Sequence, residues 1–164
     1  IVGSEPDEWM DVSHDTIFHS KRAVLQGEWL GSGPLPRDLA LKGSEHGEQT
    51  ALFCWASAVA RVVDQRLGLM FAIPNGGKRD PKTAAMLKAE GVRKGVPDVF
   101  LPVPCGGFAG LFVELKKRRV GRTSDSQDSM IEQLVNNGYQ AKVAYGWREA
   151  AEIIKGYMEL RNCV

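Results

Sequence analysis

The sequence predicts an α/β or α+β fold in which a mixed β-sheet is flanked by helices. Helix-like and strand-like patterns alternate along the chain in the order α-β-α-β-β-α-β-α, which is typical of such folds. Two of the strand-like runs are separated by only a short glycine-rich turn, which indicates an antiparallel hairpin within the sheet. The composition, with 164 residues of which 43% are hydrophobic and 25% charged, is that of one ordinary globular domain.

The first half of the chain is predicted to contain an arm, a helix and a short strand. Residues 1–43 read as an irregular N-terminal arm that ends in a stretch rich in glycine and proline, and residues 44–164 form the main domain. Apolar residues recur with helical spacing over 45–67, which predicts a helix. The apolar run 70–74 predicts a strand that an Asn-Gly-Gly turn closes.

The second half is predicted to contain three helices and three strands. Asp80 followed by Pro81 is a helix start, and Ser124 with Gln127 has the spacing of a capping box. The helices are expected at 80–91, 124–138 and 147–160, and the strands at 97–103, 109–116 and 139–145. Five aromatic residues at core-like positions are expected to pack in the interior rather than to stack on nucleobases: Phe53, Trp55, Phe100, Phe112 and Tyr145.

Charge is distributed unevenly, although the formal net charge is only +1. Residues 1–50 hold 4 Lys and Arg against 9 Asp and Glu, whereas residues 76–122 hold 11 against 4. The basic middle of the chain favours a polyanionic partner such as nucleic acid. The alternative that charge alone leaves open is that these basic residues only solvate helix faces.

The cysteines and the apolar runs restrict the class of protein. Three cysteines without CxxC spacing favour free thiols in a reducing, cytoplasmic compartment over a disulfide framework or a zinc site. The longest apolar stretch, 51–63, is too short to span a membrane, and the acidic N-terminus is unlike a signal peptide, so we expect no membrane partner. The missing initiator Met suggests a trimmed or excerpted chain.

The predicted hairpin brings two carboxylates together. If it is symmetric about Gly106, Asp98 lies opposite Glu114, and directly opposed side chains have Cβ atoms roughly 4.5–5.5 Å apart. Like charges at that distance repel unless a positive group lies between them. Lys116 lies two residues after Glu114 and therefore on the same face. The three residues form either a structural ion-pair network or a divalent-cation site in which the lysine orients or deprotonates a water.

Several short motifs occur in one order along the chain. Pro97-Asp98, then fifteen residues, then Glu114-Leu115-Lys116 resembles the signature of the PD-(D/E)XK nuclease superfamily. The flanking motifs are His46-Gly47-Glu48-Gln49, Pro74-Asn75-Gly76-Gly77, Gly91-Val92-Arg93-Lys94-Gly95-Val96-Pro97-Asp98, Phe112-Val113-Glu114-Leu115-Lys116, Ser124-x-x-Gln127 and Gly138-Tyr139. Together they resemble the VRR-NUC branch of that superfamily over residues about 45–155. The resemblance implies a restriction-endonuclease-like mixed sheet core, α-β-β-β-α-β, flanked by helices.

The resemblance also implies the roles of the site residues. Asp98, Glu114 and the Leu115 carbonyl would bind Mg²⁺ or Mn²⁺. Glu48 would be an additional acidic residue that binds a metal or its water, although it could instead be an acid favoured by the helix dipole. Lys116 would position the attacking water and stabilise the transition state. Gln127 would lie near the site, or only close the capping box with Ser124, or do both.

Basic and polar residues around these motifs are candidates for DNA binding, since phosphate contacts give sequence-independent affinity. The candidate DNA-binding residues are Asn75, Lys78, Arg79, Arg93, Lys94, Lys117, Arg118, Arg119 and Arg122. Asn75 could instead serve only a turn, and the basic residues could be merely solvated.

The expected function is therefore a metal-dependent, structure-selective DNA endonuclease, cytoplasmic and bacterial or phage-encoded. The resemblance implies branched DNA such as Holliday junctions as substrate and a homodimer as the working state. Alternatives are a less selective or flap-type nuclease, a restriction-type enzyme that reads sequence, and a non-catalytic DNA-binding module on a nuclease fold. The complete set of Glu48, Asp98, Glu114, Lys116 and Gln127 argues against the last of these.

Overall fold

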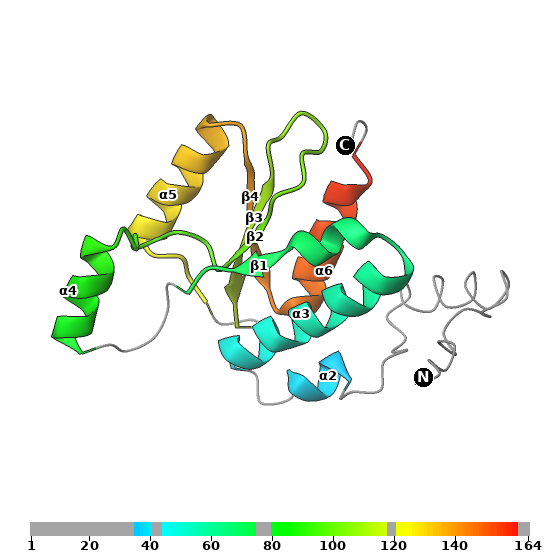
Figure 1. Cartoon of the computed structure of the whole chain (residues 1–164), viewed down its shortest axis with the longest axis horizontal. Helices are drawn as coiled ribbons and strands as arrows, with labels where there is room; N and C mark the ends of the chain where they lie inside the picture. Colours follow the sequence, from blue (N-terminus) through cyan, green and yellow to red (C-terminus); the bar gives the residue numbers. More distant parts are fainter. Residues whose placement is uncertain (1–34, 41–43, 75–79, 118–120, 161–164) are drawn as a thin grey trace, which may run out of the picture.

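A four-stranded mixed β-sheet lies at the centre of the computed structural model, which describes residues 35–40, 44–74, 80–117 and 121–160 (Figure 1). The strands are β1 (Phe71–Ala72), β2 (Val99–Leu101), β3 (Leu111–Lys116) and β4 (Gln140–Tyr145), in the spatial order β1-β2-β3-β4. β1, β2 and β3 pair antiparallel, and β4 pairs parallel to β3. The predicted mixed sheet is confirmed, with strands that are shorter than the apolar runs suggested.

The helices lie on both sides of this sheet (Figure 1). They are α2 (Pro36–Leu39), α3 (Glu45–Val62), the 3₁₀ helix η1 (Gln65–Leu69), α4 (Pro81–Ala89), α5 (Asp125–Asn136) and α6 (Trp147–Met158). α3 and α6 cover one face of the sheet, whereas α5 packs on β4 from the other side. Within the described residues, none of the helices is both long and apolar enough to cross a membrane.

Helices α4 and α5 begin where the capping residues in the sequence predict. The Asp80 side chain accepts a hydrogen bond of 3.0 Å from Thr83 N at the start of α4, and Pro81 follows at the first helical position. The capping box of Ser124 and Gln127 opens α5 as predicted. α3 ends earlier than expected, because the Asp64 carboxylate accepts a hydrogen bond of 3.0 Å from Arg66 N and begins η1 instead.

The segment expected to be an irregular arm contains one turn of helix among its described residues. α2 begins at Pro36, whose fixed φ suits the first position of a helix. The prediction of irregular structure is therefore wrong for residues 36–39, where Leu39 and Ala40 pack against the core. Burial of these apolar residues stabilises the single helical turn α2, although the nearby glycine and proline residues favour irregular structure.

The hydrophobic core lies between the sheet and the helices α3 and α6. Alternate residues of β2 and β3 point toward it, together with one face of each helix. Its largest buried members include Leu52, Leu101, Leu111, Val113, Ile154 and Tyr157. Trp55 packs here as expected, but Phe100 and Phe112 lie on the opposite face of the sheet, and Tyr145 is exposed. The expectation of a core position is therefore wrong for Tyr145.

The cysteines differ from the expectation of three free thiols. Cys54 forms no disulfide, whereas Cys105 is disulfide-bonded, and Cys163 lies outside the described residues. Cys105 lies in the turn of the β2–β3 hairpin, and the residues just after α6 pack against this turn, since a Cβ added at Gly106 would lie 2.7 Å from Leu160. Such proximity arises only in the folded chain, so the spacing of cysteines in the sequence does not signal it.

Candidate active site

The register of the β2–β3 hairpin places Asp98 and Glu114 together, as the symmetric hairpin predicts. Val99 pairs with Val113 and Phe100 with Phe112, without a bulge. Continued by one residue, this register sets Asp98 opposite Glu114 on the face that turns away from α3 and α6. The Asp98 Oδ2 atom accepts a hydrogen bond of 2.9 Å from Leu115 N, which fixes the carboxylate against β3.

Lys116 lies between the charged and polar groups of the site. Its Nζ donates to Glu114 Oε1 at 2.7 Å and to Gln127 Oε1 at 3.2 Å. Both Lys116 and Glu114 are buried, so this pair is held in a poorly solvated environment. The ammonium group is therefore fixed on this face of the sheet by its hydrogen bonds rather than extended into solvent.

Gln127 connects this pair to the start of α5. Its Nε2 donates to Glu114 Oε1, while its Oε1 accepts from Ser124 N at 2.9 Å. The capping-box role and the position near the site, which the sequence left as alternatives, therefore coexist in one side chain. The helix start positions the amide, and the amide in turn positions Glu114 and Lys116.

The electrostatics of the site favour a cation. Burial is the main cause that raises the pKa of Asp98 and of Glu114 above their ordinary values. The charge on Asp98 raises the pKa of Glu114 further, and Lys116 opposes the rise at both carboxyls. One lysine only partly compensates the buried Glu114 and the half-buried Asp98, so a further positive charge would stabilise both carboxylates.

A third acid, Glu45, contributes to the electrostatics of this site. It lies in the first turn of α3, and its charge raises the pKa of both Asp98 and Glu114. Glu45 is not among the predicted site residues, which include Glu48 one turn later. Glu48, Leu52 and Val59 fall on one helical stripe that faces the core, whereas Glu45 is exposed.

Glu48 is buried in the interior and contacts the start of α6. Its side chain is only 1% exposed, and its Oε2 accepts a hydrogen bond of 2.8 Å from Trp147 N at the start of α6. A carboxylate at a helix N-terminus is stabilised by the helix dipole. Glu48 is not among the charged groups that shift the pKa of Asp98 or Glu114. The described hydrogen bond therefore joins Glu48 to α6, and its role as a ligand of a metal or of its water stays a prediction.

Four of the predicted DNA-binding residues are described, and all four are exposed: Arg93, Lys94, Lys117 and Arg122. Arg93 and Lys94 line a surface cavity of about 630 Å³ next to α4. Gly95, at φ +91°, packs so closely on α5 that an added Cβ would lie 2.2 Å from Ser126 O. This contact brings the basic pair next to the start of α5. Asn75, Lys78, Arg79, Arg118 and Arg119 lie outside the described residues.

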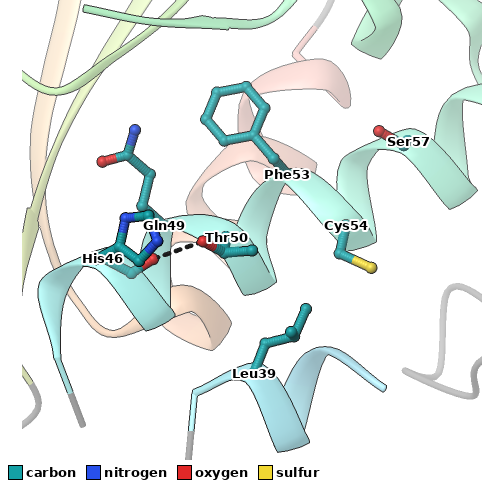
Figure 2. Close-up of a pocket in the computed structure, with 7 residues that line it drawn as sticks. All are labelled: Leu39, His46, Gln49, Thr50, Phe53, Cys54 and Ser57. Atoms are coloured by element: carbon teal, nitrogen blue, oxygen red, sulfur yellow. Dashed lines mark hydrogen bonds between the residues drawn. The ribbon is translucent and has the colours of Figure 1, made fainter. Parts of the chain in front are cut away.

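A second surface pocket, of about 540 Å³, lies between α2 and α3 (Figure 2). Leu39, His46, Thr50 and Cys54 are among its lining residues, and Thr50 Oγ1 donates to the His46 carbonyl at 2.8 Å. Burial raises the pKa of the Cys54 thiol, which keeps it protonated and weakly nucleophilic. None of the predicted site residues lines this pocket. In the described part of the chain, no group of three or more His, Cys, Asp and Glu side chains could hold a metal ion.

Comparison with known proteins identifies the family. A model of the VRR-NUC domain matches residues 42–147, more than half of the chain. A solved structure described as a VRR_NUC domain protein is similar to this chain, with a TM-score of 0.61 and 28% sequence identity over 71% of this chain and 88% of that chain. No curated protein matches the chain. The chain therefore belongs to the VRR-NUC family of nucleases, and its mixed sheet with flanking helices is a nuclease-like fold.

Proposed function

We propose that this protein is a Mg²⁺- or Mn²⁺-dependent endonuclease that hydrolyses phosphodiester bonds in branched DNA. The observation that carries the proposal is the grouping of Asp98, Glu114, Lys116 and Gln127 on one face of the sheet. Two carboxylates beside a fixed ammonium group are the donors that metal-assisted phosphodiester hydrolysis needs.

The residues of the site fit a divalent cation. Glu114 Oε2 is buried and has no hydrogen-bond partner within the described residues, so it offers a free lone pair. Asp98, Glu114 and the Leu115 carbonyl would hold the ion, and all three are the hard oxygen ligands that Mg²⁺ and Mn²⁺ prefer. Mg²⁺ usually retains several waters and takes one or two carboxylates, which agrees with a site where the described residues supply no group of three or more ligating side chains.

When bound, such an ion supplies Lewis acidity and lowers the pKa of a coordinated water. The chain's own groups orient and stabilise the reactants. Lys116 has three N–H donors, of which the described contacts with Glu114 and Gln127 use two. The third is available for the attacking water or a phosphate oxygen, where it would stabilise the negative charge that develops on phosphorus. Water attacks phosphorus, the 3′ oxygen leaves, and the product keeps its 5′-phosphate.

Exposed basic residues beside the site would hold the DNA backbone. Arg93 and Lys94 precede Asp98 in the chain, and Lys117 and Arg122 follow the catalytic strand. These side chains lie on both flanks of the two carboxylates in the sequence, and each phosphate contact would make binding weaker at higher salt. DNA would therefore cross the face that carries Asp98, Glu114 and Lys116.

Branched DNA and a homodimer are the finer parts of this proposal. Stand-alone proteins of the VRR-NUC family are linked with branched DNA, and some resemble Holliday-junction resolvases that act as homodimers. Two copies of this chain would present two sites to the two strands that must be cut at a four-way junction.

Cleavage of labelled DNA tests the proposal. Four-way junction, flap, single-stranded and linear duplex DNA would each be incubated with Mg²⁺, Mn²⁺ or EDTA, with Glu114→Gln as the matched variant. We expect metal-dependent cutting of the junction by the wild-type protein and none by the variant. Binding of every substrate without cutting in any metal would refute the nuclease function, and equal cutting of linear duplex would refute the preference for branches.

A further inference from the structure

The sheet face that carries the candidate site continues into a row of aromatic rings. Phe100 lies two residues after Asp98, and Phe112 lies two residues before Glu114, so strand alternation places all four side chains on one face. The rings of Phe100 and Phe112 stack with their centroids 4.2 Å apart and their planes at 20°. At roughly 3.3 Å per residue, the row begins about 7 Å along the strands from the carboxylates.

Phe71 forms the outer end of this row. It lies directly opposite Phe100 in the β1–β2 register, with the ring centroids 5.6 Å apart at an interplanar angle of 85°. Tyr139 makes edge contacts with Phe100 and Phe112. Phe112 is buried, whereas Phe71 remains 48% exposed. Packing therefore accounts for the inner rings but leaves about half of the outermost ring in solvent.

The position of Phe71 is tied to the candidate site through the backbone. Two residues further along the same segment, Ile73 N donates a hydrogen bond of 2.7 Å to the Asp98 carbonyl. The edge contact with Phe100 holds the Phe71 ring from one side. The ring contact and the backbone hydrogen bond therefore place the exposed ring at a defined position relative to Asp98.

We propose that Phe71 is a stacking platform for a nucleobase that has left the helical stack near the scissile phosphate. This inference rests on the proposed function and names the feature of the substrate that is recognised. In the interior of a linear duplex both faces of each base are covered by neighbouring bases, whereas a branch point, flap or single strand presents a free face away from a duplex end. Exposed cations beside the site, among them Arg93 and Lys94, would hold the backbone while the base lies on the ring.

Binding to metal-free protein tests this platform without requiring cleavage. Fluorescence anisotropy in EDTA would compare single-stranded DNA, a four-way junction and linear duplex. The proteins would be wild type, Phe71→Ala, Phe71→Leu, Phe71→Trp and Leu69→Ala. Leu69 is a matched control because it is also exposed, at 56%, but lies on η1 without an aromatic contact in the described structure. Phe71→Leu keeps an apolar side chain in case Phe71→Ala does not fold.

Loss of the ring should weaken binding of single-stranded and junction DNA about tenfold and leave duplex binding unchanged. Phe71→Trp should bind like wild type, as should Leu69→Ala. Unchanged binding by Phe71→Leu, or an equal loss on duplex, would overturn the platform. The platform would also be overturned if wild type elutes as a dimer and Phe71→Leu as a monomer in size-exclusion chromatography, since the ring would then contact a second copy of the chain.

The same measurements separate this inference from the proposed function. Selective loss of binding in Phe71→Leu, without metal-dependent cutting by wild type, would keep the platform and refute the nuclease activity. Metal-dependent junction cutting with unchanged binding by Phe71→Leu would refute the platform alone. A wild-type protein that binds none of these DNAs would refute both.

Discussion

The Asp98 carboxylate accepts a hydrogen bond of 2.9 Å from the backbone N–H of Leu115. This bond fixes Asp98 beside Glu114, the residue before Leu115, although the two negative charges repel each other. Burial raises the pKa of both carboxyl groups, and Lys116 opposes this rise at both carboxyls. In the metal-free site, the hydrogen bond to the backbone therefore holds the two carboxylates together despite their repulsion, and a bound cation would reduce that repulsion.

Asp98→Asn should make the metal-free protein more stable while abolishing cleavage. The amide oxygen of Asn can still accept the Leu115 hydrogen bond, but the buried charge beside Glu114 is removed. We expect a gain of about 1 kcal/mol, a typical effect of relaxing a functional site, or a rise in Tm of about 2–4 °C. Thermal denaturation in EDTA measures it, with Asp98→Ala as a control that also loses the acceptor. A Tm of Asp98→Asn below that of wild type would contradict this account of the site.

The negative charges of Asp98 and Glu114 should make the stability of the metal-free protein fall as the pH rises. Because the folded-state pKa values of Asp98 and Glu114 are raised, the folded protein holds protons that the unfolded chain has released. Their contribution to stability is therefore largest below the ordinary carboxyl pKa and falls as pH rises through the raised folded values. The gain in stability from Asp98→Asn should grow with pH over this window. Urea denaturation from about pH 4 upward measures it, and a gain that stays constant with pH would speak against buried charge as the cause.

Lys116→Ala should separate DNA binding from cleavage. Removing a donor to developing negative charge typically lowers the rate about 100- to 1000-fold. Exposed residues, Arg93 and Lys94 among them, are the proposed phosphate contacts and are unchanged in this variant, so affinity for junction DNA should be retained. Single-turnover cleavage in Mg²⁺ and anisotropy in Ca²⁺ give the two quantities. A variant that cleaves at the wild-type rate would show that Lys116 has only a structural role.

Substitution by alanine should lower the stability at Glu48 and the metal affinity at Glu45. Glu48→Ala removes a buried acceptor from Trp147 N and should lower the free energy of unfolding by about 1–3 kcal/mol. Glu45 is exposed, so Glu45→Ala should change stability by less than about 0.5 kcal/mol. It should nevertheless weaken metal affinity, because a nearby negative charge is lost. Denaturation curves and Mn²⁺ titration of both variants measure the two effects. If Glu48→Ala weakens Mn²⁺ binding and Glu45→Ala does not, Glu48 is the acid that contributes to metal binding.

Gly95→Ala should disturb the site from a distance. Its Cβ would lie 2.2 Å from the Ser126 carbonyl oxygen, so α5, which carries Gln127, would have to move. Gly91→Ala is a matched control, because Gly91 also has a positive φ, +97°, but no atom within 4 Å of an added Cβ. Both substitutions carry backbone strain of order 1 kcal/mol, and only Gly95→Ala adds the clash. Chemical denaturation should show the larger loss at Gly95, and equal losses would mean that the contact with α5 is unimportant.

The parts of the site that lie close together in the sequence could be predicted from it. The short turn at Gly106 determines the hairpin register, and that register places Asp98 opposite Glu114. The interval from Ser124 to Gln127 likewise predicts a capping box that the structure contains. Both depend on local backbone geometry, which a few neighbouring residues specify.

Features that depend on packing between distant segments were predicted less well. Glu48 and Glu45 are both acids in the first turn of α3, and only the docking of α6 distinguishes the buried Glu48 from the exposed Glu45. The disulfide at Cys105 and the exposure of Tyr145 likewise follow from the folded arrangement rather than from spacing. A periodic apolar pattern shows that a residue can be buried, but it does not show which face of a sheet the remaining elements will cover.

Titration with Mn²⁺ tests the central claim most directly, because it needs neither a known substrate nor cleavage. The electron paramagnetic resonance signal of free Mn²⁺ would be followed as ion is added to wild-type protein and to the double variant Asp98→Asn/Glu114→Gln. We predict saturable binding to wild type, competed by Mg²⁺, and none to the double variant. Equal binding by both proteins, or no binding by either, would contradict a metal-dependent active site at Asp98 and Glu114.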